Sequence, residues 1–190
     1  MEIIKIEKEY MKGNILNFDI NSLNGIGWVA GGSIRRWFNG EPYNNSDIDI
    51  FLKEEDYISE VIENLKLKNE LFTTKNSITF LLNDQKIQII KTLFSENIED
   101  LFDHFDFKHC QFAYNTEGVF STPEAIICAL RKRMVIHNIQ FGYELDTLRR
   151  AFKYQKSGYI PCFGTFQNLA MSFKNLSEEQ IQQLESMSEE

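Results

Sequence analysis

The clearest pattern in the chain is a short apolar stretch that enters a pair of glycines and is followed, after a polar loop, by an alternating strand. Ile26 to Ala30 runs into Gly31-Gly32, which predicts a buried strand that ends in a tight turn. Ser33 is placed to cap a short helix, which Asn39-Gly40 would close. Asp47 to Leu52 then alternates polar and apolar side chains, as a strand with one buried face does.

Helical and strand periods alternate in the segments that follow. Apolar residues recur with a helical period from Asp56 to Lys66 and again from Asn97 to Phe105. Between them, Ser77 to Leu82 and Lys86 to Leu93 flank the turn pair Asn83-Asp84. These segments predict an antiparallel hairpin between two helices, although the glycine that such turns prefer is absent.

The rest of the chain, from Phe107 on, is predicted to be mainly helical. Phe107 to Tyr114 alternates and is rich in aromatic residues, which favours one more strand before strand signals fade. Thr122 is the N-cap of a helix that runs to about Met134, and a second helix covers Tyr143 to Lys156. The acidic tail, Ser177 to Glu190, is a further helix candidate because a capping box opens it.

Length and composition match one main domain. The chain has 190 residues, of which 43% are hydrophobic and 25% are charged. It has no apolar run long enough to cross a bilayer and no secretory signal at its start, so we expect a cytoplasmic protein that does not bind membranes. The pattern predicts an α+β fold with a mixed, mostly antiparallel sheet and flanking helices, divided into a head (residues 1–120) and a helical lobe with the acidic tail (residues 121–190).

Cysteine usage and charge narrow the chemistry. The three cysteines are odd in number and irregularly spaced, which favours reduced thiols over a disulfide framework or a zinc site. The formal net charge of −8 argues against a general affinity for nucleic acid. Locally the balance reverses, because the segment from Arg131 to Lys156 holds seven basic and two acidic residues. On its helix, Arg149 and Lys153 share a face that could receive nucleotide phosphates or a polynucleotide end, or could simply be solvated.

Two aspartates on the alternating strand are the strongest chemical signal. Asp47 and Asp49 project to the same side of the strand, whereas Ile48 and Ile50 face the opposite, buried side. Paired carboxylates suit magnesium, which is usually bound together with the phosphates of a nucleotide. The Gly31-Gly32-Ser33 turn adds backbone N–H groups that phosphate oxygens can approach. A calcium loop or a plain surface strand is the alternative, but a calcium loop would carry more acids and a central glycine.

The stretch GGSIRRWFNGEPYNNSDIDIF resembles the DNA polymerase β-like nucleotidyltransferase superfamily. It is most similar there to the head of CCA-adding enzymes and bacterial poly(A) polymerases and to small stand-alone phage or bacterial nucleotidyltransferases. The resemblance spans about Gly27 to Tyr114 and continues more faintly to Tyr159. It implies that Asp47 and Asp49 bind Mg²⁺, with Mn²⁺ as an alternative. It also implies a nucleoside triphosphate as substrate, held by Gly31, Gly32, Ser33 and Arg35.

The sequence departs from this family at several positions. Asp106 stands where CCA-adding enzymes carry the acid of an R-R-D-F-T-x-N-A motif, so it would complete the metal site or position the ribose, unless it only caps a turn. Gln88 stands where the family has a further carboxylate, and its neutral oxygen is a weaker ligand. Arg36 replaces the family's aspartate, and no E-D-x-x-R motif is evident near Tyr143, so we do not infer C-then-A addition.

The hypothesis from sequence is a metal-dependent nucleotidyltransferase that moves a nucleoside monophosphate from the triphosphate to an acceptor hydroxyl and releases pyrophosphate. Asp47, Asp49 and Asp106 would be its catalytic residues, and Arg149 and Lys153 would help to bind the nucleotide. The expected acceptor is an RNA 3′ end, such as that of tRNA. Two alternatives stay open: a transferase that nucleotidylates a protein, and a catalytically weak nucleotide-binding module of a toxin–antitoxin or phage–host system. The sequence does not indicate an oligomeric state.

Overall fold

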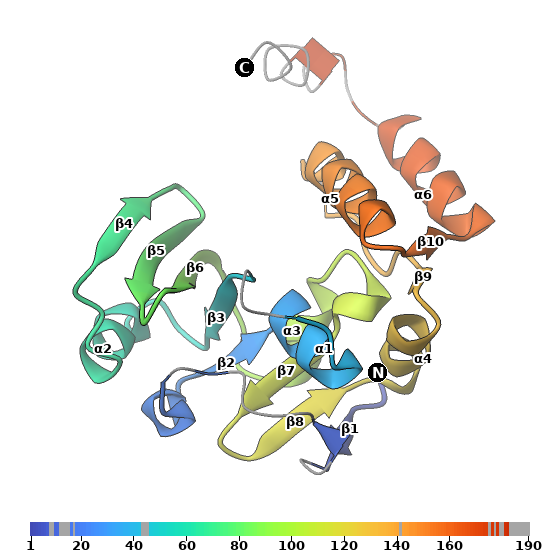
Figure 1. Cartoon of the computed structure of the whole chain (residues 1–190). Helices are drawn as coiled ribbons and strands as arrows, with labels where there is room; N and C mark the ends of the chain where they lie inside the picture. Colours follow the sequence, from blue (N-terminus) through green and yellow to red (C-terminus); the bar gives the residue numbers. More distant parts are fainter. Residues whose placement is uncertain are drawn as a thin grey trace.

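A mixed sheet organises the computed structural model, which describes residues 1–7, 10–11, 16, 18–42, 46–140, 142–174, 176, 178 and 181–182. Its strands are β1 (Ile4–Ile6), β2 (Gly27–Ala30), β3 (Ile48–Leu52), β4 (Glu70–Thr73), β5 (Ser77–Leu82), β6 (Gln85–Phe94), β7 (Phe112–Asn115) and β8 (Gly118–Ser121). They form an eight-stranded sheet in the order β1-β8-β7-β2-β3-β6-β5-β4 (Figure 1). Among these strands β3 and β6 pair in parallel and the other neighbours are antiparallel, which confirms the expected fold class.

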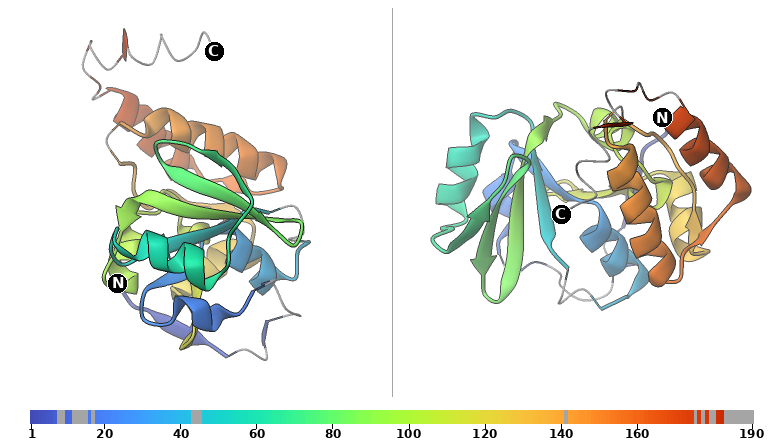
Figure 2. Two further views of the ribbon diagram at one scale, coloured as in Figure 1. Left: turned by 90° about the vertical axis from the view of Figure 1, so that its left-hand side faces the viewer. Right: turned by 90° about the horizontal axis from the view of Figure 1, so that it is seen from above.

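Helices flank this sheet and form a lobe beside it. They are α1 (Gly32–Asn39), α2 (Tyr57–Asn64), α3 (Ile98–Asp103), α4 (Pro123–Leu130), α5 (Glu144–Lys156) and α6 (Phe163–Lys174), with 3₁₀ turns η2 (Ile20–Leu23) and η3 (Lys108–Cys110). A short parallel pair of strands, β9 (Arg133–Met134) and β10 (Ile160–Pro161), lies at the base of the lobe: β9 follows α4, and β10 lies between α5 and α6. Helices α5 and α6 lie side by side at the end of the molecule opposite α2 and β4 (Figures 1 and 2). None of the described helices is both long and apolar enough to span a membrane.

Several expectations from the hydrophobic pattern are confirmed. The hairpin of β5 and β6 turns at Asn83 and Asp84, whose φ angles of 49° and 64° are both left-handed. This is the backbone that a tight two-residue hairpin turn requires, and Asn and Asp tolerate it better than most residues. Ile48 and Ile50 of β3 are fully buried, as the alternation predicts. Cys110, Cys128 and Cys162 are free thiols.

The strand predicted for Phe107 to Tyr114 is wrong over its first half. Lys108–Cys110 forms the turn η3, and β7 begins only at Phe112. Phe107 and Cys110 lie three residues apart, the spacing that a 3₁₀ turn places on one side, and both are buried in the same apolar cluster. The alternation in this segment therefore reflects a turn packed against the lobe.

Two predicted helix boundaries are also wrong. Helix α4 ends at Leu130, because Lys132 adopts φ 51° and the chain turns into β9. Helix α1 begins at Gly32 with Gly31 as N-cap, so Ser33 is not its capping residue. The capping box at Ser177 and Gln180 lies outside the described residues.

Some elements carry too little pattern to be predicted from sequence. They are β1, η2, β4, β8, β9, β10 and α6. The strands among them have four residues or fewer, which is too short for a clear alternation of apolar and polar side chains. Most of α6 is exposed, so its sequence shows no apolar face with helical spacing.

Apolar side chains form two clusters against the sheet and a third under the lobe. Ile34 and Trp37 of α1, with Ala125 and Ala129 of α4, join the buried residues of the sheet. The lobe cluster consists of Phe107, Cys110, Met134, Ile136, Tyr159 and Leu169. Helix α4 therefore packs with the sheet, while α5 and α6 pack on η3 and β9. The division at residue 120 stays a prediction.

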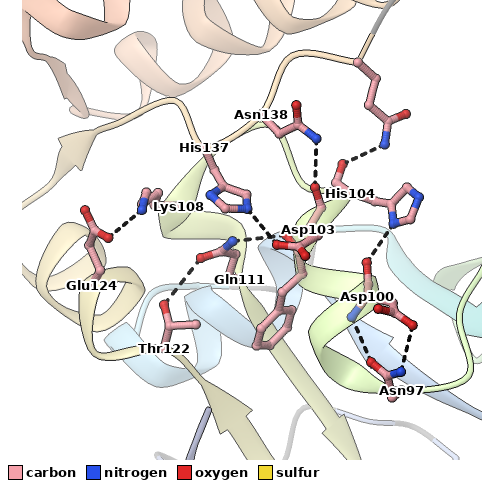
Figure 3. A network of polar contacts seen from close by, with 12 residues as sticks. Asn97, Asp100, Asp103, His104, Lys108, Gln111, Thr122, Glu124, His137 and Asn138 are labelled. Carbon is pink, nitrogen blue, oxygen red and sulfur yellow. Dashed lines mark hydrogen bonds and ion pairs between the residues drawn. The ribbon is translucent and has the colours of Figure 1, made fainter. Parts of the chain in front are cut away.

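A polar network ties the lobe's first segment to the head (Figure 3). His137 Nε2 lies 3.2 Å from Asp103 Oδ1, and Asn138 Nδ2 donates to the Asp103 carbonyl at 3.0 Å. The buried Gln111 joins two helices, because it donates to the Phe102 carbonyl of α3 (3.0 Å) and accepts from Thr122 at the start of α4 (3.3 Å). These contacts fix the segment between α3 and η3, which contains Asp106.

We predict that Thr122→Ala lowers the free energy of unfolding by about 1–2 kcal/mol. The Thr122 hydroxyl accepts from the Ala125 N–H at the start of α4 and donates to Gln111, and it is buried. Urea unfolding of Thr122→Ala and Thr122→Ser provides the test, because serine keeps the hydroxyl. Equal losses in the two variants would contradict this role.

Candidate functional site

Asp47 and Asp49 lie together where β3 begins, in the middle of the sheet. Asp49 is in register with Ala30 of β2 on one side and with Gln88 of β6 on the other. Asp47 directly precedes the strand and is exposed, whereas Asp49 is half-buried. Burial and the neighbouring Asp47 carboxylate raise the pKa of Asp49 to about 7. The two carboxylates thus repel each other, and a bound cation would relieve that repulsion.

The N-terminus of α1 borders the same site. Gly31 follows Ala30, the register partner of Asp49, and its N–H donates to the Phe112 carbonyl at 2.8 Å. Its φ of 85° is a left-handed conformation that glycine adopts without strain. A Cβ on Gly31 or Gly32 would meet no atom within 4 Å, so both glycines border open space. The first turn of α1 therefore offers unobstructed backbone N–H groups, a favourable place for phosphate.

A cleft of about 550 Å³ connects this turn with α5. Its wall on the sheet side includes Gly31, Gly32, Asp49, Phe51, Ile90, Thr92 and Leu93. Its other residues are His104, Phe105, Asp106, Cys110, Gln140, Tyr143, Thr147, Arg150 and Tyr154. A volume of this size fits a nucleotide-sized ligand, and the lining combines polar side chains with aromatic rings.

Asp106 lies in the same cleft, where its carboxylate is paired with a cation. Its carboxylate, with a side chain only 12% exposed, forms an ion pair with Arg150 of α5. Burial raises the pKa of Asp106, and the Arg150 guanidinium and the Thr147 hydroxyl oppose that rise. Within the described residues no three His, Cys, Asp or Glu side chains are grouped closely enough to hold a metal ion. Both expected roles of Asp106, completing the metal site or positioning the ribose, stay predictions.

Gln88 completes the surroundings of the pair as an amide. Its Nε2 donates to Asp47 Oδ2 at 3.3 Å, which holds one carboxylate in place. The donor set at this position is two carboxylates and one amide, all oxygen-bearing groups that a hard cation prefers. With the open glycine turn beside it, this set fits Mg²⁺ or Mn²⁺ that also binds the phosphates of a nucleotide.

The structure separates the two basic residues predicted for nucleotide binding. Lys153 lies close enough to Asp49 that its charge lowers the pKa of that carboxyl. Arg149 instead is exposed and lies 3.6 Å from Asp146 on the same helix. Only Lys153 is therefore brought near the candidate site.

Arg35 and Ser33 lie behind the glycine turn rather than in the cleft. The Arg35 side chain is 1% exposed, and its guanidinium lies 5.4 Å from the ring centre of Tyr154 and 4.9 Å from that of Tyr159. Its Nε and Nη1 find no hydrogen-bond acceptor among the described residues. Ser33 is also buried, and its hydroxyl has no partner in the same part of the chain. Neither side chain lines the cleft.

An aromatic cluster surrounds the Arg35 cation. His109 stacks on Tyr159 with ring centres 4.3 Å apart and meets Tyr154 edge-on at 4.4 Å. Lys132, which is paired with Glu41, lies 5.0 Å from the Tyr159 ring centre. Burial first, and then the positive charges of Arg35 and Lys132, lower the pKa of His109 to about 2. His109 is therefore neutral in the folded protein.

Sequence reasoning missed the cleft face of α5. Arg150, which holds Asp106, is next to Arg149 in the sequence, and charge alone does not distinguish them. The signal was the spacing of Tyr143, Thr147, Arg150 and Tyr154, which recurs every three or four residues and places all four on one helix face.

Comparison with protein families gives one match, which covers most of the chain. A family model described as Gabija anti-defense 2 family protein matches residues 4–133. A protein of Bacillus phage SPbetaL7 named Gabija anti-defense 2 is 29% identical over 135 residues, which are 69% of this chain and 33% of that protein. The chain thus spans about a third of the length of this relative.

Solved structures share the fold at low sequence identity. A Thermotoga maritima CCA-adding enzyme complexed with tRNA matches 90% of this chain and 46% of its own, with a TM-score of 0.64 and 17% identity. A CCA-adding enzyme with CTP matches 92% and 47%, with a TM-score of 0.64 and 20% identity. The fold of nucleotidyltransferases, which the motif resemblance implies, is therefore present, in a chain that spans less than half of these proteins.

We predict that His109 makes stability depend on pH. Unfolded histidine has a pKa near 6.5, so below that pH the unfolded state gains a proton that the folded state does not bind. The free energy of unfolding then falls by up to about 1.4 kcal/mol per pH unit as the pH decreases from 6.5 toward 2, and the loss is absent above 6.5.

Urea unfolding of the parent protein and His109→Phe at pH 7 and pH 5 tests this dependence. The parent is expected to lose about 2 kcal/mol more than the variant. His104→Gln, at an exposed position, is the control and should behave like the parent. Parallel pH dependence of the parent and His109→Phe would contradict the prediction.

Proposed function

The chain belongs to the Gabija anti-defense 2 family, and on this premise we propose that it is a metal-dependent nucleotidyltransferase. The reaction is the attack of an acceptor hydroxyl on the α-phosphorus of a nucleoside triphosphate. A bond forms between the acceptor oxygen and phosphorus, the bond to the bridging oxygen breaks, and pyrophosphate leaves. The acceptor proton passes to solvent.

One observation carries this proposal: the paired carboxylates face the open glycine turn across neighbouring strands. Asp49 is in register with Ala30, the residue before Gly31, so the cation ligands and the phosphate-binding N–H groups are adjacent. A surface D-x-D strand or a common glycine turn would have no reason to coincide in this way at the mouth of a cleft.

Different residues along the cleft would bind the cation, the triphosphate and the nucleoside. Asp47 and Asp49 would hold Mg²⁺ or Mn²⁺, which when bound lowers the pKa of an acceptor hydroxyl and offsets the charge on phosphate. The N–H groups of the first turn of α1 orient the triphosphate, and Lys153 adds a positive charge near Asp49. The ion pair of Asp106 and Arg150 also lines the cleft and would position the ribose or base.

For the acceptor we propose an RNA 3′ end. Two proteins of similar fold have been solved with tRNA bound: the Thermotoga maritima CCA-adding enzyme, and a tRNA nucleotidyltransferase in complex with a primer tRNA. The basic segment of the lobe gives this acidic chain a place for phosphates. The chain spans less than half of those proteins, so the proposal is confined to the 3′ end of an RNA and does not extend to a whole tRNA.

The family and Gln88 favour a second candidate. A module that binds nucleoside triphosphate with little turnover would need fewer carboxylates, and an anti-defense protein can act by binding alone. The proposed transferase could also use a protein hydroxyl, instead of RNA, as its acceptor.

Incubation with each α-labelled nucleoside triphosphate, MgCl₂, and cellular RNA or protein separates these functions. Label in RNA supports the proposal with its acceptor, and label in protein supports the transferase with a different acceptor. Nucleotide-dependent thermal stabilisation without transfer would replace the enzyme by the binding module.

We predict that Asp47→Asn and Asp49→Asn each reduce transfer by about 10²–10³-fold, because each removes half of the negative charge that holds the cation. The measurement is the initial rate of label incorporation. Asp56→Asn is the matched control, since Asp56 is an exposed aspartate that makes no capping hydrogen bond at α2. Unchanged rates in both site variants would exclude this chemistry.

We also predict that Gln88→Glu changes the response to metal. The variant replaces a donor to Asp47 by a third carboxylate, so without metal its free energy of unfolding falls by about 1–2 kcal/mol. With MgCl₂ or MnCl₂, its melting temperature should rise more than that of the parent. Gln167→Glu, exposed on α6, should show no added response. A Gln88→Glu variant that gains no metal dependence would show that the cation binds elsewhere.

A further inference from the structure

The outer face of α5 combines an exposed aromatic ring with positive charges. Arg149, Phe152, Lys153 and Lys156 follow the spacing i, i+3, i+4, i+7, which places them on one side of a helix. All four are exposed, and Phe152 is 57% exposed. We call these four residues the α5 stripe. They lie away from the residues of α5 that line the cleft, such as Thr147 and Arg150.

The exposed ring and the charges of the α5 stripe are not needed to pack α5 against the rest of the protein. Leu148 and Ala151 of α5 pack on the lobe cluster, so the helix is already anchored without Phe152. An exposed phenylalanine has no compensating contact of that kind, and three flanking cations in a chain of net charge −8 concentrate what positive charge there is. Of the three, Arg149 has an acidic neighbour, Asp146, at 3.6 Å. Both members of that pair are exposed, so the contact is weak and a phosphate can replace it.

The stripe is continuous with the candidate site through Lys153. This residue lies at the edge of the stripe and is close enough to Asp49 for its charge to act on that carboxyl. In Figures 1 and 2, α5 lies on the same side of the molecule as α1, whose first turn forms part of the cleft.

We propose that the α5 stripe binds the single-stranded 3′ segment of an RNA acceptor, with one base stacked on Phe152 and backbone phosphates on Arg149, Lys153 and Lys156. The choice of RNA rests on the proposed function. Aromatic stacking combined with a row of cations is the general way in which proteins hold unpaired strands without reading their sequence. A purely acidic protein partner would use the cations but would leave the phenylalanine ring without a role.

Fluorescence anisotropy of a fluorescein-labelled oligoadenylate RNA tests this surface directly, without requiring turnover. Phe152→Ala is expected to weaken binding by about 5- to 100-fold, and Phe152→Trp to retain it. The matched control is Phe166→Ala, because Phe166 on α6 is 59% exposed and lies outside the stripe. Arg149→Gln and Lys156→Gln should each reduce the salt dependence of binding, with a change in slope of about 0.7.

Several outcomes would overturn the inference: equal losses for Phe152→Ala and Phe166→Ala, tighter binding of the matched DNA, or equal competition by polyglutamate. Label transfer tests the proposed function independently of RNA binding. RNA binding through the stripe without label transfer supports the inference and removes the transferase. Transfer to protein with no RNA binding removes the inference and keeps the transferase.

Discussion

A buried cation lies where the lobe packs against the helix that borders the aspartate pair. Arg35 projects from α1, the helix whose first turn borders the aspartate pair, and its guanidinium is enclosed by Tyr154 and Tyr159 of the lobe. A guanidinium is costly to remove from water, and here aromatic faces supply part of the compensation. The contact therefore packs α5 against α1, and both helices contribute residues to the cleft.

The same cluster sets the polarity of the site. Positive charge behind the glycine turn adds to the partial charge of the α1 N-terminus, whereas Asp47 and Asp49 provide negative charge in front of it. His109 stays neutral beside Arg35, so the cation is not opposed by a second charge on the ring next to it. A phosphate chain that lies along the turn thus meets alternating charges, positive in the helix and negative at the strand.

Local sequence patterns predicted the elements that carry the site. They did not predict features that depend on contacts between segments far apart in the chain. The alternation of Asp47 to Leu52 and the turn at Asn83-Asp84 are local, and the structure has them as predicted. The burial of Arg35 is not local, because the rings that cover it come from α5 and the segment after it. Phe107 to Cys110 was misassigned for a similar reason: its apolar residues face the lobe rather than a sheet neighbour. Whether the predicted site residues act in catalysis stays a prediction.

The pairing of β2 has a consequence for how the molecule is assembled. This strand lies between β3, which follows it closely, and β7, which comes much later in the chain. Such long-range contacts raise the contact order and slow folding, and a nascent chain has one open edge on β2 until β7 emerges. The cleft has no outer wall until α5 has been added and Tyr159 has closed over Arg35. Synthesis from the N-terminus therefore delivers the carboxylates first and the outer wall of the cleft last, so an incomplete chain has no closed cleft.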